Sequence, residues 1–502
     1  MRLLAWLLAA SLAAIPCAFA QEATPPRYGR SEPPLDLTPR AAPLPDLGDV
    51  NASELSLAME RRIGEEVMRE IRRDPAYMDD PEIAEYLNAL GAQLAAAAPG
   101  ARQDFEFFAI RDNSINAFAL PGGFVGVHTG LITITDNESE LASVMAHEMA
   151  HVTQRHIARQ VGIQAKMQVP MMIAMAAAIL LGRSRPDLAS GAMAAVQGGA
   201  VSSQLAYSRD FEREADRIGF QTLQGAGLDV RSMGQFFEKM QRYTRLQDSG
   251  VVPGYLRSHP VTTDRISDAQ ARAEGQPYRQ RADSVEYHLV RAKLRADAGE
   301  PRDAVRIFTD AVSDRRFANE PGARYGLAIA YMRASDPRRA EAEVAHLRAD
   351  KVASPMVDTL AARARLAQGD TAGAMAILKA AFARYPHRRS LLYAMLDIQL
   401  GQGRYDEVLA MLVEPMRLYT RDVKLHEARA KAYAGQGKRL LQHQEQAEVY
   451  FLQGSLPAAI EQLQFAQSAG DGNFYEQSAV DARLKELRAE HARDMQDQKK
   501  SR

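Results

Sequence analysis

Two histidines one helical turn apart are the residues of this chain best suited to do chemistry. His147 and His151 enclose the segment His-Glu-Met-Ala-His. At this spacing both imidazoles project from one face of a helix, so they can bind a single zinc ion. Glu148 lies beside them, where its carboxylate can act on a water molecule next to the metal. The pattern predicts a hydrolytic zinc centre with Glu148 as its general base.

Such a centre needs a third protein ligand and one open position for water. A third histidine six positions after the second is absent, because Ile157 stands there. We expect His156 to lie on another helix face as a solvent-facing or capping residue. In the later acidic segment, Glu212 and Asp216 are one helical turn apart. Either can bind zinc while the other accepts a hydrogen bond from a ligand histidine, although a solvated acidic helix face is the structural alternative.

Helices and short extended segments must position these side chains. Hydrophobic periodicity and capping residues predict helices at 52–73, 81–98, 138 through at least 159, and 207–225, before the repeats described below. Extended segments are expected at 105–110, 115–120 and 124–132. Pro121-Gly122-Gly123 separates the last two as a hairpin turn would. The zinc motif therefore belongs to the helix that starts at Glu138.

The loop and edge residues around this site offer further contacts. Pro260 biases His259 toward an extended backbone, so its imidazole can project from a loop, or it can cap a helix starting near Val261. Tyr207, Arg209 and His259 can stabilise an oxyanion. The extended segment 114–119 can add a substrate strand to an exposed sheet edge.

The second half of the chain is repetitive from about Ser284. Glycines recur there at intervals of 70, 34 and 34 residues, with Ser335 in the intermediate position: Gly299, Gly369, Gly403 and Gly437. A 34-residue period with a small residue at the turn resembles the tetratricopeptide repeat, although Gly454 repeats the pattern out of phase. A generic helical bundle is the alternative. Such repeats form a solenoid with a concave face for protein partners.

The N-terminus has the form of a secretion signal. Arg2 precedes the apolar run 3–15, and Ala18-Phe19-Ala20 predicts cleavage after residue 20, which would place the mature protein in a periplasm. A lipoprotein anchored at Cys17 is the alternative, but the preceding Pro16 fits it poorly. Residues 21–50 contain seven prolines and are expected to form a disordered leader.

Composition restricts the function classes. The 502 residues carry 62 basic and 63 acidic side chains, so a nucleic-acid or polybasic membrane binder is disfavoured. Cys17 is the only cysteine, which excludes a disulfide framework and a thiolate metal site. The apolar stretch 169–182 is too short to span a bilayer, so no transmembrane segment is expected in the mature chain and membrane contact would be peripheral.

Three motifs together resemble the HtpX-like gluzincin metallopeptidases. They are the segment 116–123, the His-Glu-Met-Ala-His motif, and the Glu-Arg-Glu-Ala-Asp segment 212–216, in that order. The resemblance implies that Glu212 is the third ligand of one zinc ion and that Asp216 supports a ligand histidine. It also implies that His259 can close over the zinc as a fourth ligand, which would keep the enzyme latent.

The resemblance also implies a fold and a role. We expect an α+β zincin-like metalloprotease domain, mostly helical with a small sheet, at 51–278. An all-α tetratricopeptide-repeat solenoid is expected at 284–490. Relatives with a signal peptide and such repeats are soluble periplasmic proteases with a chaperone-like role. Their clients are outer-membrane barrel proteins and the machinery that assembles them.

Two other functions are compatible with the sequence. The chain could be a non-proteolytic, repeat-based scaffold whose zinc site is regulatory, although every residue needed for hydrolysis is present. It could also be a zinc hydrolase of cell-wall material. Nothing favours sugar binding, because the single tryptophan, Trp6, lies in the predicted signal peptide.

Overall fold

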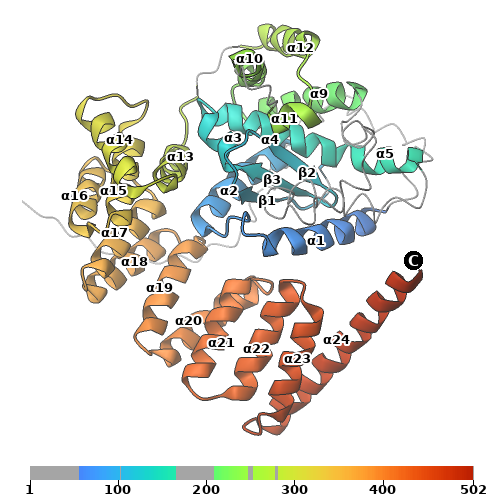
Figure 1. The fold of residues 1–502 in the computed structure, drawn as a ribbon, viewed down its shortest axis with the longest axis vertical. Coiled ribbons are helices and arrows are strands. Elements are labelled where there is room, and N and C mark those ends of the chain that lie inside the picture. The colour runs from blue at the N-terminus through green and yellow to red at the C-terminus, as the bar shows by residue number, and fades with distance from the viewer. Residues whose placement is uncertain (1–55, 102, 165–208, 247–252, 278–280, 501–502) are drawn as a thin grey trace, which may run out of the picture. The chain divides into compact units, whose positions relative to one another are not determined.

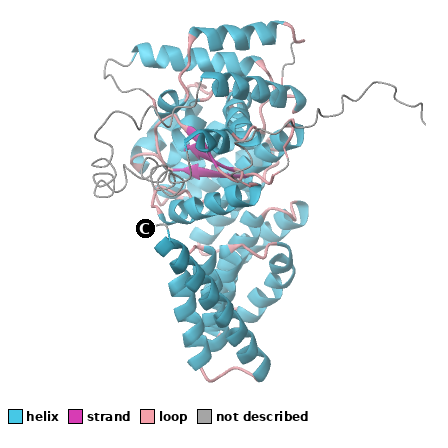
Figure 2. Cartoon of the chain, turned by 90° about the vertical axis from the view of Figure 1, so that its right-hand side faces the viewer, coloured by secondary structure: helices cyan, strands magenta, loops and turns pink. Residues whose placement is uncertain are grey.

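The computed structural model describes residues 56–500 apart from 102, 165–208, 247–252 and 278–280 (Figures 1 and 2). The predicted signal peptide, the Pro-rich leader, the apolar stretch 169–182 and Tyr207 lie outside the described residues. Among the helices within those ranges, none has the length and apolar character needed to cross a membrane.

A three-stranded sheet in the order β1-β3-β2 underlies the predicted metal motif. Its strands are β1 (Glu106–Ile110), β2 (Ala117–Leu120) and β3 (Phe124–His128). β1 pairs with β3 in parallel, whereas β2 and β3 form the expected antiparallel hairpin. Gly122 and Gly123 make its turn with φ angles of 79° and 95°, a conformation that favours glycine.

The third extended segment is shorter than expected. The strand ends at His128, whereas the sequence predicted that it would continue to Ile132. The short helix α3 (Thr129–Ile134) begins directly after it. Thr129 is held by a hydrogen bond from its Oγ1 to the Asp112 carbonyl oxygen, at 2.9 Å. This contact with a residue 17 positions earlier lies at the point where the helix starts.

Helix α4 (Glu138–Thr153) is the centre of the first part of the chain. It starts at the predicted cap, where the Asn137 side chain accepts a hydrogen bond from the Glu140 amide. Its residues are buried from Glu138 through Val152, between the sheet and the helices that follow in sequence. The surrounding helices are α1 (Leu57–Arg73), α2 (Pro81–Ala97), α9 (Arg209–Gly225), α10 (Arg231–Leu246), α11 (Gly254–Ser258) and α12 (Thr263–Glu274).

The prediction of one helix from 138 through 159 is wrong. The chain turns at Arg155, whose φ is 55°, and a separate helix, α5 (His156–Gln164), follows. The Arg155 guanidinium donates two hydrogen bonds to Glu60 on α1, at 2.8 and 2.7 Å. The break therefore has a long-range partner that no local pattern of this segment could reveal.

The second half of the chain is an array of antiparallel helices, as the 34-residue period predicts. Its helices are α13 (Val285–Asp297), α14 (Pro301–Ser313), α15 (Glu320–Arg333), α16 (Pro337–Ala349), α17 (Pro355–Ala367), α18 (Thr371–Arg384), α19 (Arg389–Gly401), α20 (Tyr405–Leu418), α21 (Val423–Gly435), α22 (Arg439–Leu452), α23 (Leu456–Ser468) and α24 (Phe474–Lys500). The five predicted turn residues all have positive φ: Gly299 64°, Ser335 58°, Gly369 84°, Gly403 70° and Gly437 72°. Gly454 falls out of phase because it turns α22 into α23.

The repeats pack directly on the helices that precede them. Tyr287 of α13 hydrogen-bonds Thr135 through its hydroxyl group, at 3.0 Å from Thr135 Oγ1. Lys293 Nζ lies 2.6 Å from carboxylate oxygens of both Asp80 and Glu82. One cluster of buried apolar side chains includes residues of both parts, from Met78 in the first to Ala361 in the repeats.

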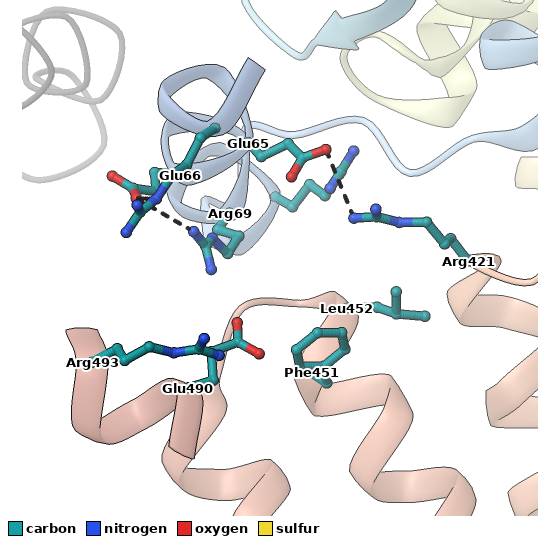
Figure 3. Close-up of a pocket in the computed structure, with 10 residues that line it drawn as sticks. Glu65, Glu66, Arg69, Arg421, Phe451, Leu452, Glu490 and Arg493 are labelled. Atoms are coloured by element: carbon teal, nitrogen blue, oxygen red, sulfur yellow. Dashed lines mark ion pairs between the residues drawn. The ribbon is translucent and has the colours of Figure 1, made fainter. Parts of the chain in front are cut away.

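A charged cavity of about 450 Å³ lies between α1 and the C-terminal repeats (Figure 3). Ion pairs of 3.9 Å join Glu65 to Arg421 and Glu66 to Arg69 at its wall. Phe451 and Leu452 supply its apolar lining. The histidines and acidic residues of the predicted metal site do not line it.

Candidate metal centre

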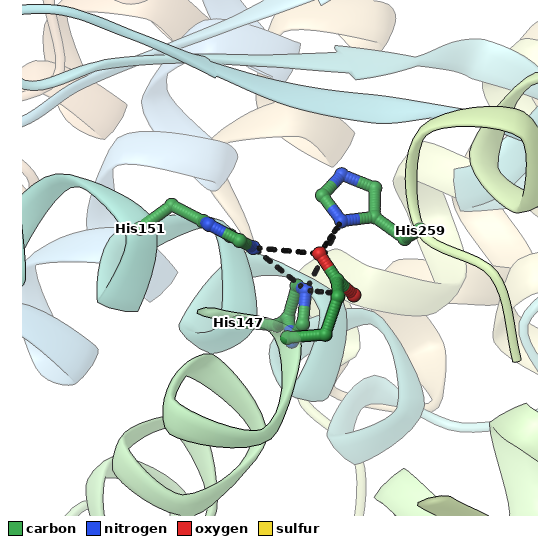
Figure 4. Close-up of side chains that lie close together, drawn as sticks. His147, His151 and His259 are labelled. Carbon is green, nitrogen blue, oxygen red and sulfur yellow. Dashed lines mark hydrogen bonds and ion pairs between the residues drawn. The ribbon is translucent and has the colours of Figure 1, made fainter. Parts of the chain in front are cut away.

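Four side chains predicted from the sequence to reach one metal ion converge in the core: His147, His151, Glu212 and His259 (Figure 4). One donor atom from each lies within 4.8 Å of the others, and all four residues are buried. The two histidines of α4 are joined by a carboxylate from α9 and by a histidine just after α11.

The donor atoms are spaced closely enough for a single metal ion. His147 Nε2 lies 3.0 Å from His151 Nε2 and 3.3 Å from His259 Nδ1. Glu212 Oε1 lies 2.9 Å from His259 Nδ1 and 3.4 Å from His151 Nε2. Metal–nitrogen bonds of about 2.0–2.1 Å in a tetrahedron place donor atoms about 3.3 Å apart. These four printed distances are close to that spacing, so the donors are near enough to one another to share one ion.

Several buried polar atoms of the site lack the hydrogen-bond partners they need within the described part of the chain, and a bound cation with its water would supply the missing interactions. Two imidazole nitrogens 3.0 Å apart, as in His147 and His151, need a proton or a cation between them. Glu148 is fully buried, yet neither of its carboxylate oxygens accepts a hydrogen bond from any described residue. A buried carboxylate without a donor is costly. The donor set and this carboxylate fit a bound metal ion together with water.

His259 is positioned by the end of a short helix. It is the C-cap residue of α11, with φ −126° and ψ 78°, and its amide donates to the Tyr255 carbonyl oxygen at 2.8 Å. Its second ring nitrogen, Nε2, lies 3.4 Å from Glu148 Oε1. The alternative that His259 caps the next helix is wrong, because Thr262 accepts the capping hydrogen bond from Arg265 at the start of α12.

The Nδ1 atom of His147, which faces away from the donor cluster, contacts the Asp216 carboxylate, and Asp216 is paired with Arg265. Asp216 Oδ1 lies 2.9 Å from His147 Nδ1. Arg265 donates two hydrogen bonds to Asp216, at 2.7 and 2.8 Å, and a third to the Pro260 carbonyl oxygen at 2.8 Å. Arg265 also forms an ion pair of 2.7 Å with Glu212. This one guanidinium therefore contacts two carboxylates of the site and the backbone next to His259.

Sequence reasoning missed Arg265. It lies in the first turn of α12 and belongs to no recognisable sequence motif. The sequence shows only that it follows Pro260 by five residues. Its burial is evident only once α9 and α12 are packed together. The missed residue is as enclosed as the predicted ones, with 5% of its surface exposed.

The charges of the site shift each other's protonation. Burial opposes charging of His147, but the carboxylates of Asp216 and Glu212 outweigh it and raise the pKa of His147 to about 9. Burial also opposes ionisation of Asp216, yet His147 and Arg265 lower its pKa. Similarly, neighbouring histidines lower the pKa of Glu212 despite its burial. Both carboxylates are therefore ionised at neutral pH, as metal ligation and its support require.

The prediction for His156 is wrong. Instead of facing solvent, it is fully buried, and its Nδ1 lies 2.8 Å from His151 Nδ1. Its Nε2 lies 3.1 Å from Glu214 Oε2. Burial outweighs the attraction of Glu214 and lowers the pKa of His156 to about 4. The break at Arg155 returns His156 to the site, and a continuous helix could not do so.

The remaining predicted residues take different places. Arg209 is exposed in the first turn of α9. β2 is an edge strand among the described strands, and the segment before it is occupied: the Tyr255 amide donates to the Ile115 carbonyl oxygen at 3.0 Å. Thus α11, which is followed directly by His259, contacts the segment predicted to bind a substrate strand.

Comparison with known proteins gives this site a family context. Residues 81–273 match peptidase family M48, and residues 365–432 match a tetratricopeptide repeat. The M48 match contains both histidines of α4, Glu212 and His259.

Two relatives match about nine tenths of the chain, and a third matches a little over half of it. The beta-barrel assembly-enhancing protease of Yersinia pestis is 30% identical over 90% of this chain and 93% of its own length. The protein of the same name from Escherichia coli K12 is 31% identical over 89% of this chain and 91% of its own. A putative member from Vibrio cholerae is 35% identical over 58% of this chain and 60% of its own. The chain therefore belongs to the M48 zinc metallopeptidases, and within them to the family of the beta-barrel assembly-enhancing proteases.

Proposed function

We propose that this protein is a periplasmic zinc endopeptidase that cleaves misassembled outer-membrane proteins and assists barrel assembly. The observation that supports it most directly is the convergence of three imidazoles and one carboxylate on a point beside the buried Glu148. Neutral nitrogen and carboxylate oxygen donors are the set that zinc takes in hydrolytic sites.

His147, His151 and Glu212 would hold one zinc ion. When bound, zinc polarises a peptide carbonyl and lowers the pKa of a water molecule. Asp216 would fix the ring of His147 by accepting its Nδ1 proton, which leaves Nε2 free to bind the metal.

Glu148 would be the general base. Its carboxylate accepts no hydrogen bond from the described residues, so it can accept a proton from the attacking water and pass it to the departing amine. Its burial excludes bulk water, which strengthens its electrostatic interaction with the metal.

His259 would act as a latch. Its Nδ1 lies among the donors in the fourth position, and a protein ligand in that position displaces the water that hydrolysis requires. The hydrogen bond from Tyr255 to Ile115 supports an overlap of the same segment with the edge where a substrate strand is proposed to bind. Departure of α11 would thus open the metal and the substrate edge together.

Clients and location are proposed from the relatives and the sequence. Relatives carry the name beta-barrel assembly-enhancing protease, and tetratricopeptide repeats commonly bind proteins. The N-terminal 20 residues have the pattern of a cleavable secretion signal. These observations favour unfolded or stalled barrel proteins, and their assembly machinery, as partners in the periplasm.

Substitution of the third ligand tests the zinc assignment. Glu212→Gln should lower bound zinc, measured by metal analysis after dialysis, and abolish casein cleavage. Its circular dichroism should stay close to that of the wild type, because the helix remains. Full zinc occupancy in this variant would move the third ligand elsewhere. Zinc binding by the wild type without any cleavage would favour the non-proteolytic scaffold.

A further inference from the structure

The second histidine of the metal motif is supported by a chain of side chains that the catalytic proposal does not use. His151 Nε2 faces the donor cluster, and its other ring nitrogen, Nδ1, lies 2.8 Å from His156 Nδ1. His156 Nε2 in turn lies 3.1 Å from Glu214 Oε2. Two ring nitrogens at this distance share one hydrogen, so the three groups form a continuous hydrogen-bonded chain.

The fold holds His156 rigidly in this chain. Its ring stacks on Phe211 with centroids 4.4 Å apart and an angle of 8° between the planes. Arg159 donates to Glu214 at 2.8 Å and lies over the same Phe211 ring. The left-handed residue Arg155 supplies the turn that directs His156 back toward His151. The arrangement comes from three elements: α4, α5 and α9.

Ligation of a metal fixes the direction of every proton in the chain. A neutral His151 that binds metal through Nε2 must carry its hydrogen on Nδ1, so Nδ1 is the donor. His156 Nδ1 must then accept, which leaves the His156 hydrogen on Nε2, where it points to Glu214. An ionised Glu214, held by Arg159, selects that tautomer. A metal-bound histidine usually donates to a carboxylate, a carbonyl or water, whereas here an imidazole is interposed.

We propose that His156 is a positioning residue of the metal centre: it accepts the Nδ1 hydrogen of His151 and, oriented by Glu214, holds that ligand's ring for metal binding. This inference rests on the proposed zinc centre. Loss of an outer partner of a ligand histidine typically weakens metal binding about 10- to 100-fold. His156 should contribute on that scale although it does not touch the metal.

The test compares three variants of the full-length chain. His156→Phe keeps the ring on Phe211 but removes the acceptor. His156→Asn places an amide oxygen near the position of Nδ1 and can restore it. His426→Phe is the matched control, because His426 is a buried histidine that also lies within 2.7 Å of a carboxylate, Glu445, but in the repeats.

Two readouts separate positioning from packing: zinc affinity by competition with a chelator, and the visible absorption spectrum after Co²⁺ substitution. His156→Phe should bind zinc about 10- to 100-fold more weakly and change the Co²⁺ spectrum. Casein cleavage at saturating zinc should show a lower kcat with little change in KM. His156→Asn should recover part of the affinity, and His426→Phe should bind zinc like the wild type.

Wild-type zinc affinity and spectrum in His156→Phe would overturn the positioning role and show that the ring only packs. If His156→Phe fails to fold, His156→Asn decides. Zinc affinity close to that of the wild type supports the role, and the absence of measurable zinc binding contradicts it. A wild-type protein that binds no zinc would overturn the proposed function itself, and this inference with it.

Discussion

Both histidines of the α4 motif have their outer ring nitrogens held by buried neighbours. His147 is held by Asp216, and His151 by His156. An arginine fixes each of these neighbours. Arg265 donates directly to Asp216, whereas Arg159 donates to Glu214, which in turn contacts His156. The geometry of the donors therefore depends on charges outside the donor set.

Arg265 should be needed for folding as well as for geometry. Arg265→Met leaves the buried carboxylates of Asp216 and Glu212 without their cation, so the free energy of unfolding of the metal-free protein should fall by about 3–5 kcal/mol. Urea denaturation in the presence of a chelator measures this. Arg417→Met is the control, since the Arg417–Glu414 pair is mostly exposed and should contribute at most about 1 kcal/mol. Equal losses in the two variants would contradict the account.

His259 should restrain the enzyme. His259→Ala removes the fourth donor while three remain, so the protein should keep its zinc and cleave casein about tenfold faster, a usual size for such coupling. Self-cleavage should rise in parallel. An unchanged or lower rate with normal zinc content would argue against a latch and for a role of His259 in the reaction itself.

The sequence could identify only part of this site. The spacing of His147 and His151 predicts their common helix face, and the family resemblance points to Glu212, Asp216 and His259. The roles of His156 and Arg265 could not be found this way. The place of His156 depends on a helix break at Arg155, which contacts Glu60 nearly a hundred residues away, and that of Arg265 depends on the packing of α12 against α9. Long-range contacts leave no local pattern.

At the scale of elements, turns with positive φ explain both the success and the failure of the predictions. The repeat turns at Gly299, Ser335, Gly369, Gly403 and Gly437 carry glycine or serine, so their period is visible in the sequence. The turn at Arg155 has the same backbone conformation with φ 55°, but no glycine marks it. Repeats are therefore predictable from turn residues, whereas the end of α4 is not.

The pairing of α21 with α22 should depend on pH. His426 Nδ1 lies 2.7 Å from Glu445 Oε2, and although burial opposes its protonation, Glu445 raises the pKa of His426. A raised pKa means that protonated His426 stabilises the fold. This contribution is complete below the unfolded-state pKa of about 6.5 and is lost as pH rises through the folded-state value.

The comparison of wild type with His426→Gln measures this effect. Gln can keep a hydrogen bond but does not titrate in this range. The difference in the free energy of unfolding between the two proteins should be largest near pH 5.5 and should shrink toward pH 8.5. Because both proteins share the same metal centre, its own pH dependence cancels. A difference that stays constant with pH would show that the charge of His426 does not matter.

At the scale of the whole molecule, the part with the metal site and the repeats share contacts as well as a core. Glu85 of α2 accepts hydrogen bonds from both the backbone and the side chain of Ser390, each at 2.8 Å, at the start of α19. The helix α19 lacks a side-chain cap of its own, so a residue of the preceding part caps it. A client bound by the repeats would thus be held on the same packed unit as the metal site.

The measurement that tests the central claim most directly is zinc content together with casein cleavage in Glu148→Gln. The substituted amide would have almost the shape of the native carboxylate but could not accept the proton of the attacking water. We predict that this variant keeps one zinc per chain, because Glu148 is not among the four donors. Its cleavage rate should fall by about 10²- to 10⁴-fold. Cleavage near the wild-type rate with normal zinc content would contradict the assignment of Glu148 as the general base.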